Sequence, residues 1–425
     1  MALSRRSLSN SEKNIKSMQV QTIQDKITRF LERKFRTSRS YSTKNTYNAA
    51  LNKFSSFLRI QYNLDVLQLL RKIETSDTDP IDILDDYYSF LAEYKRENSI
   101  KTGYSNQTIC DYISVVKEFL NGEGCKIYNE DIKQRFKLPR KINVYEKGLT
   151  KDTINRIIRQ ANPKLAAVIL IACSGGMRIG EIVQLRFADV DLKVNPARIT
   201  IRAETAKTRE TRITHISFEA VSALRDYLSR KKIEMKNENY LFLLQHEDRL
   251  KILKKRLAKN EYENSGLYKI DLKNVNILES NLKKLSKEER YSKSVLSTCH
   301  NLEKQLSTVL KNIPELSEKN ENGRNAIHFH ALRAWFKTQV TDAHQSDFAE
   351  ALMGHKSLKL VYYRQNDKAR AQTYLDVEHS LTISDTEKMD QNYTQIQKDN
   401  QELRGIVDNL SRQLQSLEKK IEFRE

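Results

Sequence analysis

The sequence is poor in the residues that interrupt helices. It contains only five prolines and 11 glycines among 425 residues. An all-β sandwich needs many turns built from these residues, so the composition argues against that fold and favours long helices. Hydrophobic residues make up 39% of the chain and charged residues 30%. We therefore expect true hydrophobic cores in two or three domains, with much charged helix surface around them.

Cysteine and long apolar runs are also scarce. The four cysteines (Cys110, Cys125, Cys173 and Cys299) are scattered and form no CxxC pair. We expect them to be free or buried thiols in a reducing cytoplasm, with no metal site. No run of 18 apolar residues occurs, and no apolar core follows the first arginines. We therefore expect neither a transmembrane helix nor a secretory signal.

Acidic residues are outnumbered by basic ones. The chain has 74 lysines and arginines against 55 acidic residues, which gives a formal net charge of +19. Such an excess indicates a polyanionic partner, either nucleic acid or an acidic membrane surface.

Composition and periodicity divide the chain into segments. Residues 1–19 are polar, basic and serine-rich, and we expect them to be disordered or to become ordered only on a partner. Apolar residues at helical spacing predict an all-helical domain over residues 20–138. A proline-containing, basic stretch at 139–148 is typical of an extended linker. Thr150 is expected to cap the first helix of a second domain over residues 149–386.

The second domain opens with a segment that favours anion binding. An apolar helix is expected to end near Ser174, because Gly175 and Gly176 interrupt it. Arg178 then opens a second, amphipathic helix. Free backbone N–H groups at a helix start favour a phosphate, although an ordinary helix–loop–helix with a solvent-exposed arginine has the same pattern.

A β-hairpin follows this helix pair. Ile199 and Ile201 alternate with polar residues, and Ile213 and Ile216 follow across a turn. This pattern predicts a hairpin or a three-stranded sheet, and hence a fold that is mainly α with a small antiparallel β-sheet, of the α+β class. Lys207 lies in the turn, where a lysine is usually only solvated.

Cations and tyrosines recur near the end of the domain. His330 and Arg333 are three residues apart and share one face of a helix. His355 follows after Gly354, and Tyr362 and Tyr363 come shortly after it. This set suits one task, which is to hold a phosphodiester while a tyrosine oxygen attacks its phosphorus. Taken alone, His330 and Arg333 would be interpreted as a surface pair or a core histidine.

The order of these motifs resembles the tyrosine recombinase, or phage integrase, family. The motifs are SGGMRIGEIVQL, HALR, LMGH and a tyrosine, and the resemblance extends from about Tyr41 to Ile383. It implies that residues 20–138 are a DNA-clamping core-binding domain and residues 149–386 the catalytic domain. The segment LMGHKSLKLVYYR is most similar to archaeal and viral integrases.

The resemblance also implies catalytic roles. Arg178 and Arg333 would neutralise the phosphate, and His330 would position it and assist proton transfer from the nucleophile. Lys207 matches the hairpin lysine that protonates the leaving 5′-oxygen, and His355 would bind a non-bridging oxygen or support the nucleophile. The product would be a 3′-phosphotyrosyl bond, so no cofactor is expected.

The nucleophile is left open between neighbouring tyrosines. Tyr362 and Tyr363 lie seven and eight residues after His355, slightly closer than the nine residues common in the family. Adjacent helical residues differ by about 100°, so only one of the pair can face the phosphate. Spacing narrowly favours Tyr363, with Tyr362 as the alternative and Tyr374 as a third candidate.

The function implied is site-specific recombination of double-stranded DNA at an attachment site, integrating or excising a viral or mobile-element genome. The chain would act as a tetramer in the cytoplasm, at the nucleoid or in a viral host. The alternatives are a type IB topoisomerase and a DNA-binding scaffold without catalysis. The candidate DNA contacts are Lys44, Asn45, Lys101, Arg140 and Lys141.

Two segments exceed the basic family plan. Residues from about 245 to 325 are lysine-rich and helical by pattern, which predicts an insertion. Residues 387–425 carry apolar heptads, which predict a coiled coil, with one amphipathic helix folded back on the protein as the alternative. Asn400 at an a position favours a parallel dimer. The expected oligomerisation residues are Ile396, Asn400, Leu403, Val407, Leu410, Leu414 and Leu417.

Overall fold

The computed structural model describes residues 10–95, 102–140, 148–231, 236–258, 266–319, 325–355 and 366–384, with side chains from residue 23 onward. The chain divides into two compact units between residues 144 and 145. Within the described ranges, no helix combines the length and the apolar composition that crossing a bilayer demands.

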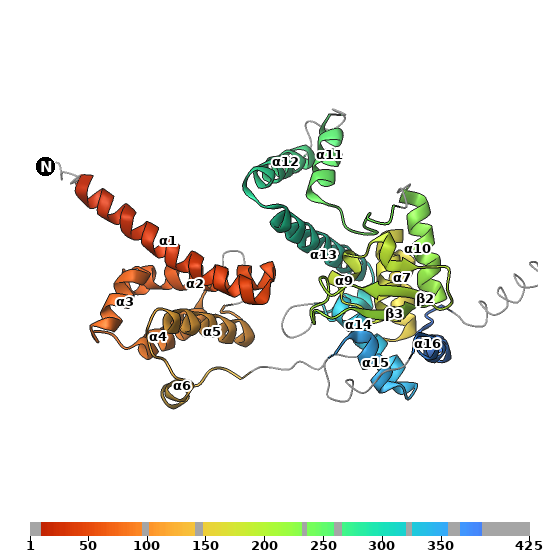
Figure 1. The fold of residues 1–425 in the computed structure, drawn as a ribbon, viewed down its shortest axis with the longest axis horizontal. Helices are drawn as coiled ribbons and strands as arrows, with labels where there is room; N and C mark the ends of the chain where they lie inside the picture. The colour runs from red at the N-terminus through yellow and green to blue at the C-terminus, as the bar shows by residue number, and fades with distance from the viewer. Residues whose placement is uncertain are drawn as a thin grey trace, which may run out of the picture. The chain divides into compact units, whose positions relative to one another are not determined.

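The first unit consists of α-helices (Figure 1). They are α1 (Asn10–Ser38), α2 (Tyr41–Phe57), the π-helical turn η1 (Leu58–Tyr62), α3 (Val66–Glu74), α4 (Pro80–Glu93), α5 (Asn106–Gly122) and α6 (Asn129–Arg135). Helix α1 begins at Asn10, inside the stretch of residues 1–19 for which we expected disorder. This stretch lacks proline and glycine, and extending an existing helix costs less than nucleating one.

Aromatic side chains fill the core of the first unit. Phe54, Phe57 and Tyr87 are fully buried. The rings of Phe54 and Tyr87 meet edge to face at 5.1 Å, an arrangement that aromatic pairs prefer. The unit therefore has a hydrophobic core of its own.

The second unit contains the sheet and the remaining described helices. They are α7 (Lys151–Gln160), α8 (Pro163–Gly175), α9 (Ile179–Val183), η2 (Phe187–Asp189), β1 (Val190–Asp191), β2 (Ala197–Ile201), β3 (Arg212–Ile216), α10 (Phe218–Lys231), α11 (His246–Leu257), α12 (Gly266–Lys284), α13 (Lys287–Lys311), η3 (Pro314–Leu316), α14 (Phe329–Asp342), α15 (Ser346–Met353) and α16 (Asp367–Leu381).

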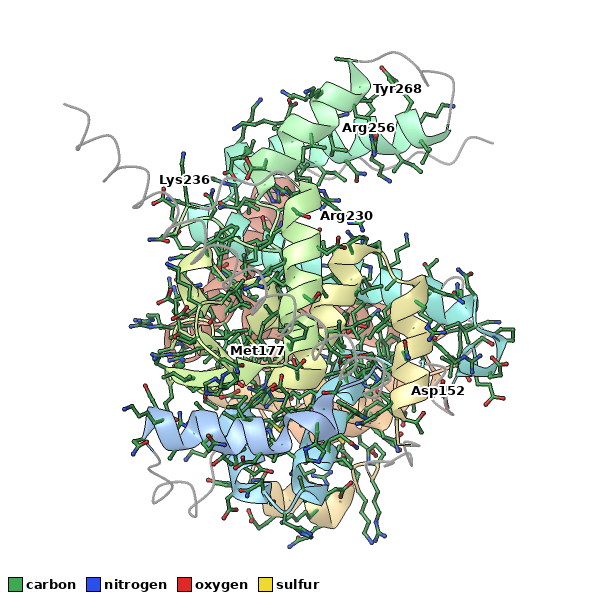
Figure 2. All side chains as sticks on the ribbon, turned by 90° about the vertical axis from the view of Figure 1, so that its right-hand side faces the viewer. Asp152, Met177, Arg230, Lys236, Arg256 and Tyr268 are labelled. Carbon is green, nitrogen blue, oxygen red and sulfur yellow. The ribbon has the colours of Figure 1, made fainter. Side chains whose placement is uncertain are left out.

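Helix α8 lies at the centre of this unit. Every residue from Ala167 to Met177 is buried, which fits a helix that is apolar on all sides. Helices α7, α10, α13, α14 and α16 contact it. Figure 2 labels Met177, which lies inside the body of the unit.

The sheet covers the C-terminal end of α8. Its strands run antiparallel in the order β1–β2–β3, with Ile199 opposite Thr214. The Thr214 hydroxyl donates to the carbonyl of Gly175 at 2.9 Å, which joins the sheet to the end of the helix. The predicted fold class, mainly α with a small antiparallel sheet, is confirmed. The predicted coiled coil at 387–425 lies outside the described residues.

The segment expected as an insertion has two parts. Helices α11 and α12 project from the unit as an arm, on which Figure 2 labels Arg256 and Tyr268. The arm has its own small cluster of Leu250, Leu253, Val275 and Leu278. Helix α13 differs, because Leu302, Leu306 and Leu310 of its second half are buried in the main core.

Candidate active site

The site is built on a sharp turn after α8. Gly176 ends the helix in the left-handed conformation, with φ of +59°, and its N–H donates to the carbonyl of Ala172 at 3.2 Å. A Cβ at this position would lie 2.4 Å from Cδ1 of Phe336. Both the backbone and the available space therefore require glycine. The turn places Arg178 at the N-cap of α9, as the sequence predicted.

Arg333 on α14 ties two of the predicted motifs together. Its side chain is 1% exposed and donates hydrogen bonds to the carbonyls of Gly176 and Met353, the latter at 2.8 Å. Its Nη2 atom lies 3.0 Å from Nε2 of His355. One guanidinium thus holds the turn before Arg178 against the loop that carries His355.

Positive charge is concentrated around Arg333. Burial lowers the pKa of Arg333 to about 10, and repulsion from Arg178 and Arg212 acts in the same direction, while Glu181 opposes it. These three arginines therefore lie close enough to repel one another.

The neighbours of His355 fix its tautomer. A guanidinium only donates hydrogen bonds, so Nε2 of His355 must accept from Arg333 and Nδ1 must carry the hydrogen that faces Glu350. Lys337 forms an ion pair with the other oxygen of Glu350 at 2.5 Å. Partial burial raises the pKa of the Glu350 carboxyl, but its hydrogen bonds with Lys337 and His355 outweigh that effect and lower it. His355 is thus held by a carboxylate on one side and an arginine on the other.

Glu181 is a site residue that our sequence reasoning missed. It is 3% exposed, and its carboxylate lies 2.6 Å from Arg212 and 3.2 Å from Arg178. It also accepts the backbone N–H of Arg178 at 2.9 Å. Glutamate three residues after a helix N-cap is a capping-box signal, so the sequence did contain a hint.

Arg212 is the second residue missed. Its guanidinium donates to both oxygens of Glu181 and, at 2.8 Å, to the carbonyl of Leu352. The side chain passes so close to Gly354 that a Cβ there would lie 2.8 Å from Cδ of Arg212. Arg212 therefore joins β3, α9 and the loop before His355, a role that no local sequence signal predicts.

Two predicted residues lie at the surface. Lys207 is exposed in the turn between β2 and β3, outside the hydrogen-bonded cluster. His330 is exposed in the first turn of α14, with its ring 6.3 Å from that of His328. The structure thus brings Arg178, Arg333 and His355 together in one cluster and leaves Lys207 and His330 accessible to a ligand.

Of the three candidate nucleophiles, only Tyr374 lies within the described residues. Tyr362 and Tyr363 lie outside the described residues. Tyr374 on α16 is completely buried and donates to the carbonyl of Ser174 at 2.9 Å. Burial raises the pKa of its hydroxyl well above the usual value. Tyr374 therefore fastens α16 to the end of α8, and its hydroxyl is buried away from the cluster of Arg178, Arg333 and His355 in the described structure.

All five candidate DNA contacts fall within the chain segment of the first unit. Asn45 and Arg140 are exposed, whereas Lys44 is half-buried with its Nζ 5.7 Å from the centre of the Phe35 ring. Lys101, Lys141 and the heptad residues of 387–425 lie outside the described part of the chain.

Comparison with known proteins gives the following matches. Residues 147–271 match the phage integrase family, a segment that includes Arg178 and Lys207 and ends before α14. Transposase A from transposon Tn554 of Staphylococcus aureus is 29% identical over 101 residues, which are 22% of this chain and 28% of the transposase. The chain thus spans about a quarter of the length of the curated relatives it matches.

Solved structures show a looser likeness. A lambda integrase dimer bound to a core site is 12% identical, with 81% of this chain and 98% of that chain covered and a TM-score of 0.47. For the XerH recombinase bound to its difH substrate the identity is 16%, the shares are 78% and 76%, and the TM-score is 0.44. The family match covers residues 147–271 and agrees with the motifs around Arg178.

Proposed function

We propose that this chain is a site-specific DNA recombinase that cleaves and rejoins strands through a 3′-phosphotyrosyl intermediate. The observation that carries the proposal is the excess of positive charge around Glu181. Arg178 and Arg212 both pair with this one buried carboxylate. The nearby Arg333 has its pKa lowered to about 10 by burial and by the charges of Arg178 and Arg212, although Glu181 and Glu350 act against this. In a poorly solvated site such an excess is costly until an anion arrives, and a phosphodiester supplies one.

The exposure of the arginines suggests a division of labour. Arg178 is partly exposed and can reach two oxygens of a phosphate with its guanidinium. The guanidinium of Arg333 already donates hydrogen bonds to the carbonyls of Gly176 and Met353. It would therefore act through its positive charge and not by contacting the phosphate. His355, with Nδ1 held by Glu350, presents its ring beside this charge.

The proposed reaction transfers the phosphoryl group from the 5′-oxygen of the DNA to the tyrosine oxygen. The tyrosine oxygen forms a bond to phosphorus while the bond from phosphorus to the 5′-oxygen breaks. His330 accepts the phenolic proton, and Lys207 gives a proton to the 5′-oxygen as it leaves. Attack by another 5′-hydroxyl reverses the step and joins a new strand.

The proposed partner is double-stranded DNA at a specific attachment site. The formal charge of +19 supports a polyanionic partner. We further propose tetramer formation on DNA and a parallel coiled-coil dimer through residues 387–425, on the basis of the heptads. The match to a transposase is consistent with a role in a mobile element.

The experiment has two stages. The protein is incubated with random genomic fragments, covalent complexes are trapped, and the attached DNA is sequenced to find its site. Tyr363→Phe and Tyr362→Phe are then tested on a nicked substrate made from that site. We expect Tyr363→Phe to form no covalent product and Tyr362→Phe to keep it, and the reverse result would move the nucleophile to Tyr362.

The same assay distinguishes the other functions. Relaxation of a supercoiled plasmid without a specific site would favour a topoisomerase, and binding without covalent product would favour a scaffold. If both single replacements still form the adduct, the tyrosine mechanism is wrong for this chain.

A further inference from the structure

Gln184 forms hydrogen bonds with three residues from different parts of the chain. It is the C-cap of α9, the five-residue helix whose N-cap is Arg178. Its carbonyl accepts a hydrogen bond from Nη2 of Arg202 at 2.9 Å, and its side-chain oxygen accepts one from the hydroxyl of Tyr291, also at 2.9 Å. Its own side-chain amide donates to the carbonyl of Gly180 at 2.7 Å. The end of α9 is therefore fixed from the sheet side and from α13.

Arg202 also anchors the turn that carries Lys207. It directly follows β2, and its carbonyl accepts the N–H groups of Thr205 and Ala206, both at 3.0 Å. Ala206 is 5% exposed, so the residue immediately before Lys207 is anchored in the core. The side chain of Arg202 thus holds the end of α9, whose N-cap is Arg178, and its carbonyl holds the turn that carries Lys207.

The guanidinium of Arg202 has little freedom to move. Its side chain is 17% exposed, and its Nε lies 3.4 Å from the buried carboxylate of Asp189. Asp189 accepts the backbone N–H of Arg186 at 2.8 Å, and the guanidinium of Arg186 lies over the ring of Tyr240. The guanidinium of Arg202 is planar and held on several sides. It is therefore suited to fix the distance between the end of α9 and the turn that follows β2.

Tyr291 connects this junction to the arm. It lies on α13, one residue after Arg290, whose Nε donates to Glu247 of α11 at 3.1 Å. Arg249 of α11 donates to Ser297, one and a half turns further along α13. The residues on either side of Tyr291 therefore clamp the base of the arm.

We propose that Arg202 and Tyr291 are positioning residues that set the separation of Arg178 and Lys207 through Gln184. This inference rests on the proposed function and deepens it. If Lys207 protonates the leaving 5′-oxygen while Arg178 holds the phosphate, the two must keep a fixed spacing. Because Tyr291 belongs to α13, that spacing depends on the helix at the base of the arm.

The test compares two substrates in single-turnover cleavage. One is the normal nicked site, and the other has sulfur in place of the bridging 5′-oxygen. A thiolate leaves without help from an acid, because thiol pKa values are about 8.5. A misplaced Lys207 should therefore matter only for the oxygen substrate. We expect Tyr291→Phe and Arg202→Lys to slow cleavage of the oxygen substrate by about 10- to 100-fold.

On the sulfur substrate the same variants should stay within about threefold of the wild type, as should Lys207→Met, which serves as the reference for a lost acid. Tyr227→Phe and Arg198→Lys are matched controls that should behave as wild type on both. Tyr227 donates to the carbonyl of Leu241 at 3.2 Å, and Arg198 forms an exposed pair with Asp367.

Two results would overturn the inference. Equal slowing on both substrates would assign Arg202 and Tyr291 to phosphate binding or folding, and no slowing on either would remove their role. Tyr291→Phe loses only a hydroxyl, so it stays informative even if Arg202→Lys fails to fold. A wild-type protein that forms no covalent product with either substrate would instead refute the proposed function itself.

Discussion

Replacing Glu181 with glutamine should destabilise the second unit more than any single charge change on its surface. The carboxylate is almost fully buried and pairs with Arg212 and Arg178. Glu181→Gln would leave the buried Arg212 without its counter-charge. Removing one partner of a buried ion pair costs about 3–5 kcal/mol. At about 2–4 °C per kcal/mol for a large domain, that loss lowers the melting temperature by about 6–20 °C.

The stability difference between the wild type and Glu181→Gln should depend on pH in a definite direction. Burial raises the pKa of Glu181, but the hydrogen bond and charge of Arg212, with the N–H and charge of Arg178, outweigh burial and lower it below its usual 4.5. A carboxyl with a lowered pKa in the folded state stabilises the protein above its unfolded pKa, and this stability is lost as pH falls through the folded value. The difference between wild type and Glu181→Gln should therefore be full at pH 7 and shrink below about pH 4.

Thermal unfolding at several pH values tests both claims. The control is Glu279→Gln, which removes only the exposed ion pair with Lys254 and should leave the unfolding of the second unit unchanged. A loss below about 1 kcal/mol at pH 7 would refute the claim that Glu181 is the main counter-charge of Arg212. A difference that grows as pH falls would refute the sign of the pKa shift.

Three further predictions follow from the site and the tail. Gly176→Ala should destabilise the second unit by more than roughly 1 kcal/mol, the cost of placing an alanine in the left-handed backbone conformation. The loss is larger because the new Cβ would also collide with Phe336, and thermal unfolding measures it. Glu350→Gln should slow single-turnover cleavage by about 10-fold, because His355 loses the charge that holds Nδ1. Removing residues 387–425 should reduce the mass found by light scattering while covalent DNA cleavage persists.

Each of these has a matched control or an opposing outcome. Gly180→Ala, at a position where a Cβ meets nothing within 4 Å, should not destabilise the unit. Lys337→Met removes only the half-exposed partner of Glu350 and should slow cleavage less than Glu350→Gln. An unchanged mass after truncation would mean that the tail does not drive assembly.

The parts of the fold that depend on local signals were predictable. Thr150 caps α7 by accepting the N–H of Thr153 at 3.2 Å, as expected from its position before a periodic helix. The break at Gly176 was readable from two successive glycines after an apolar run. These features are decided within a few residues of the chain, where propensity and turn chemistry operate.

The contacts that assemble the site were not predictable from spacing. Arg212 reaches the carbonyl of Leu352 across 140 residues, and Arg333 reaches that of Gly176 across 157. Such pairings depend on how helices and strands pack, which the sequence pattern does not encode locally. Tyr374 is an instructive case, because Tyr374, Val377 and Leu381 follow the three-to-four-residue spacing of a buried helical face. That spacing is typical of a core tyrosine, but we did not use it in the prediction and kept Tyr374 as a candidate nucleophile.

The boundary of the insertion has a consequence that can be measured. Residues 245–325 read as one lysine-rich segment, yet Leu302, Leu306 and Leu310 of α13 are each at most 1% exposed in the main core. Burying one leucine contributes about 1.5–3 kcal/mol, so losing all three removes most of the roughly 5–15 kcal/mol that stabilises a typical domain. Deleting 245–325 should therefore unfold the second unit.

A shorter deletion should behave differently. Replacing residues 250–284 with a glycine–serine linker removes the arm together with its own apolar cluster and leaves α13 in place. Circular dichroism and thermal unfolding should show a folded second unit for this variant and none for the longer deletion. If both deletions fold equally well, α13 contributes little to the core. If both unfold, the arm itself is needed for the stability of the second unit, because the α11 residues Glu247 and Arg249 that contact α13 are kept in the shorter deletion.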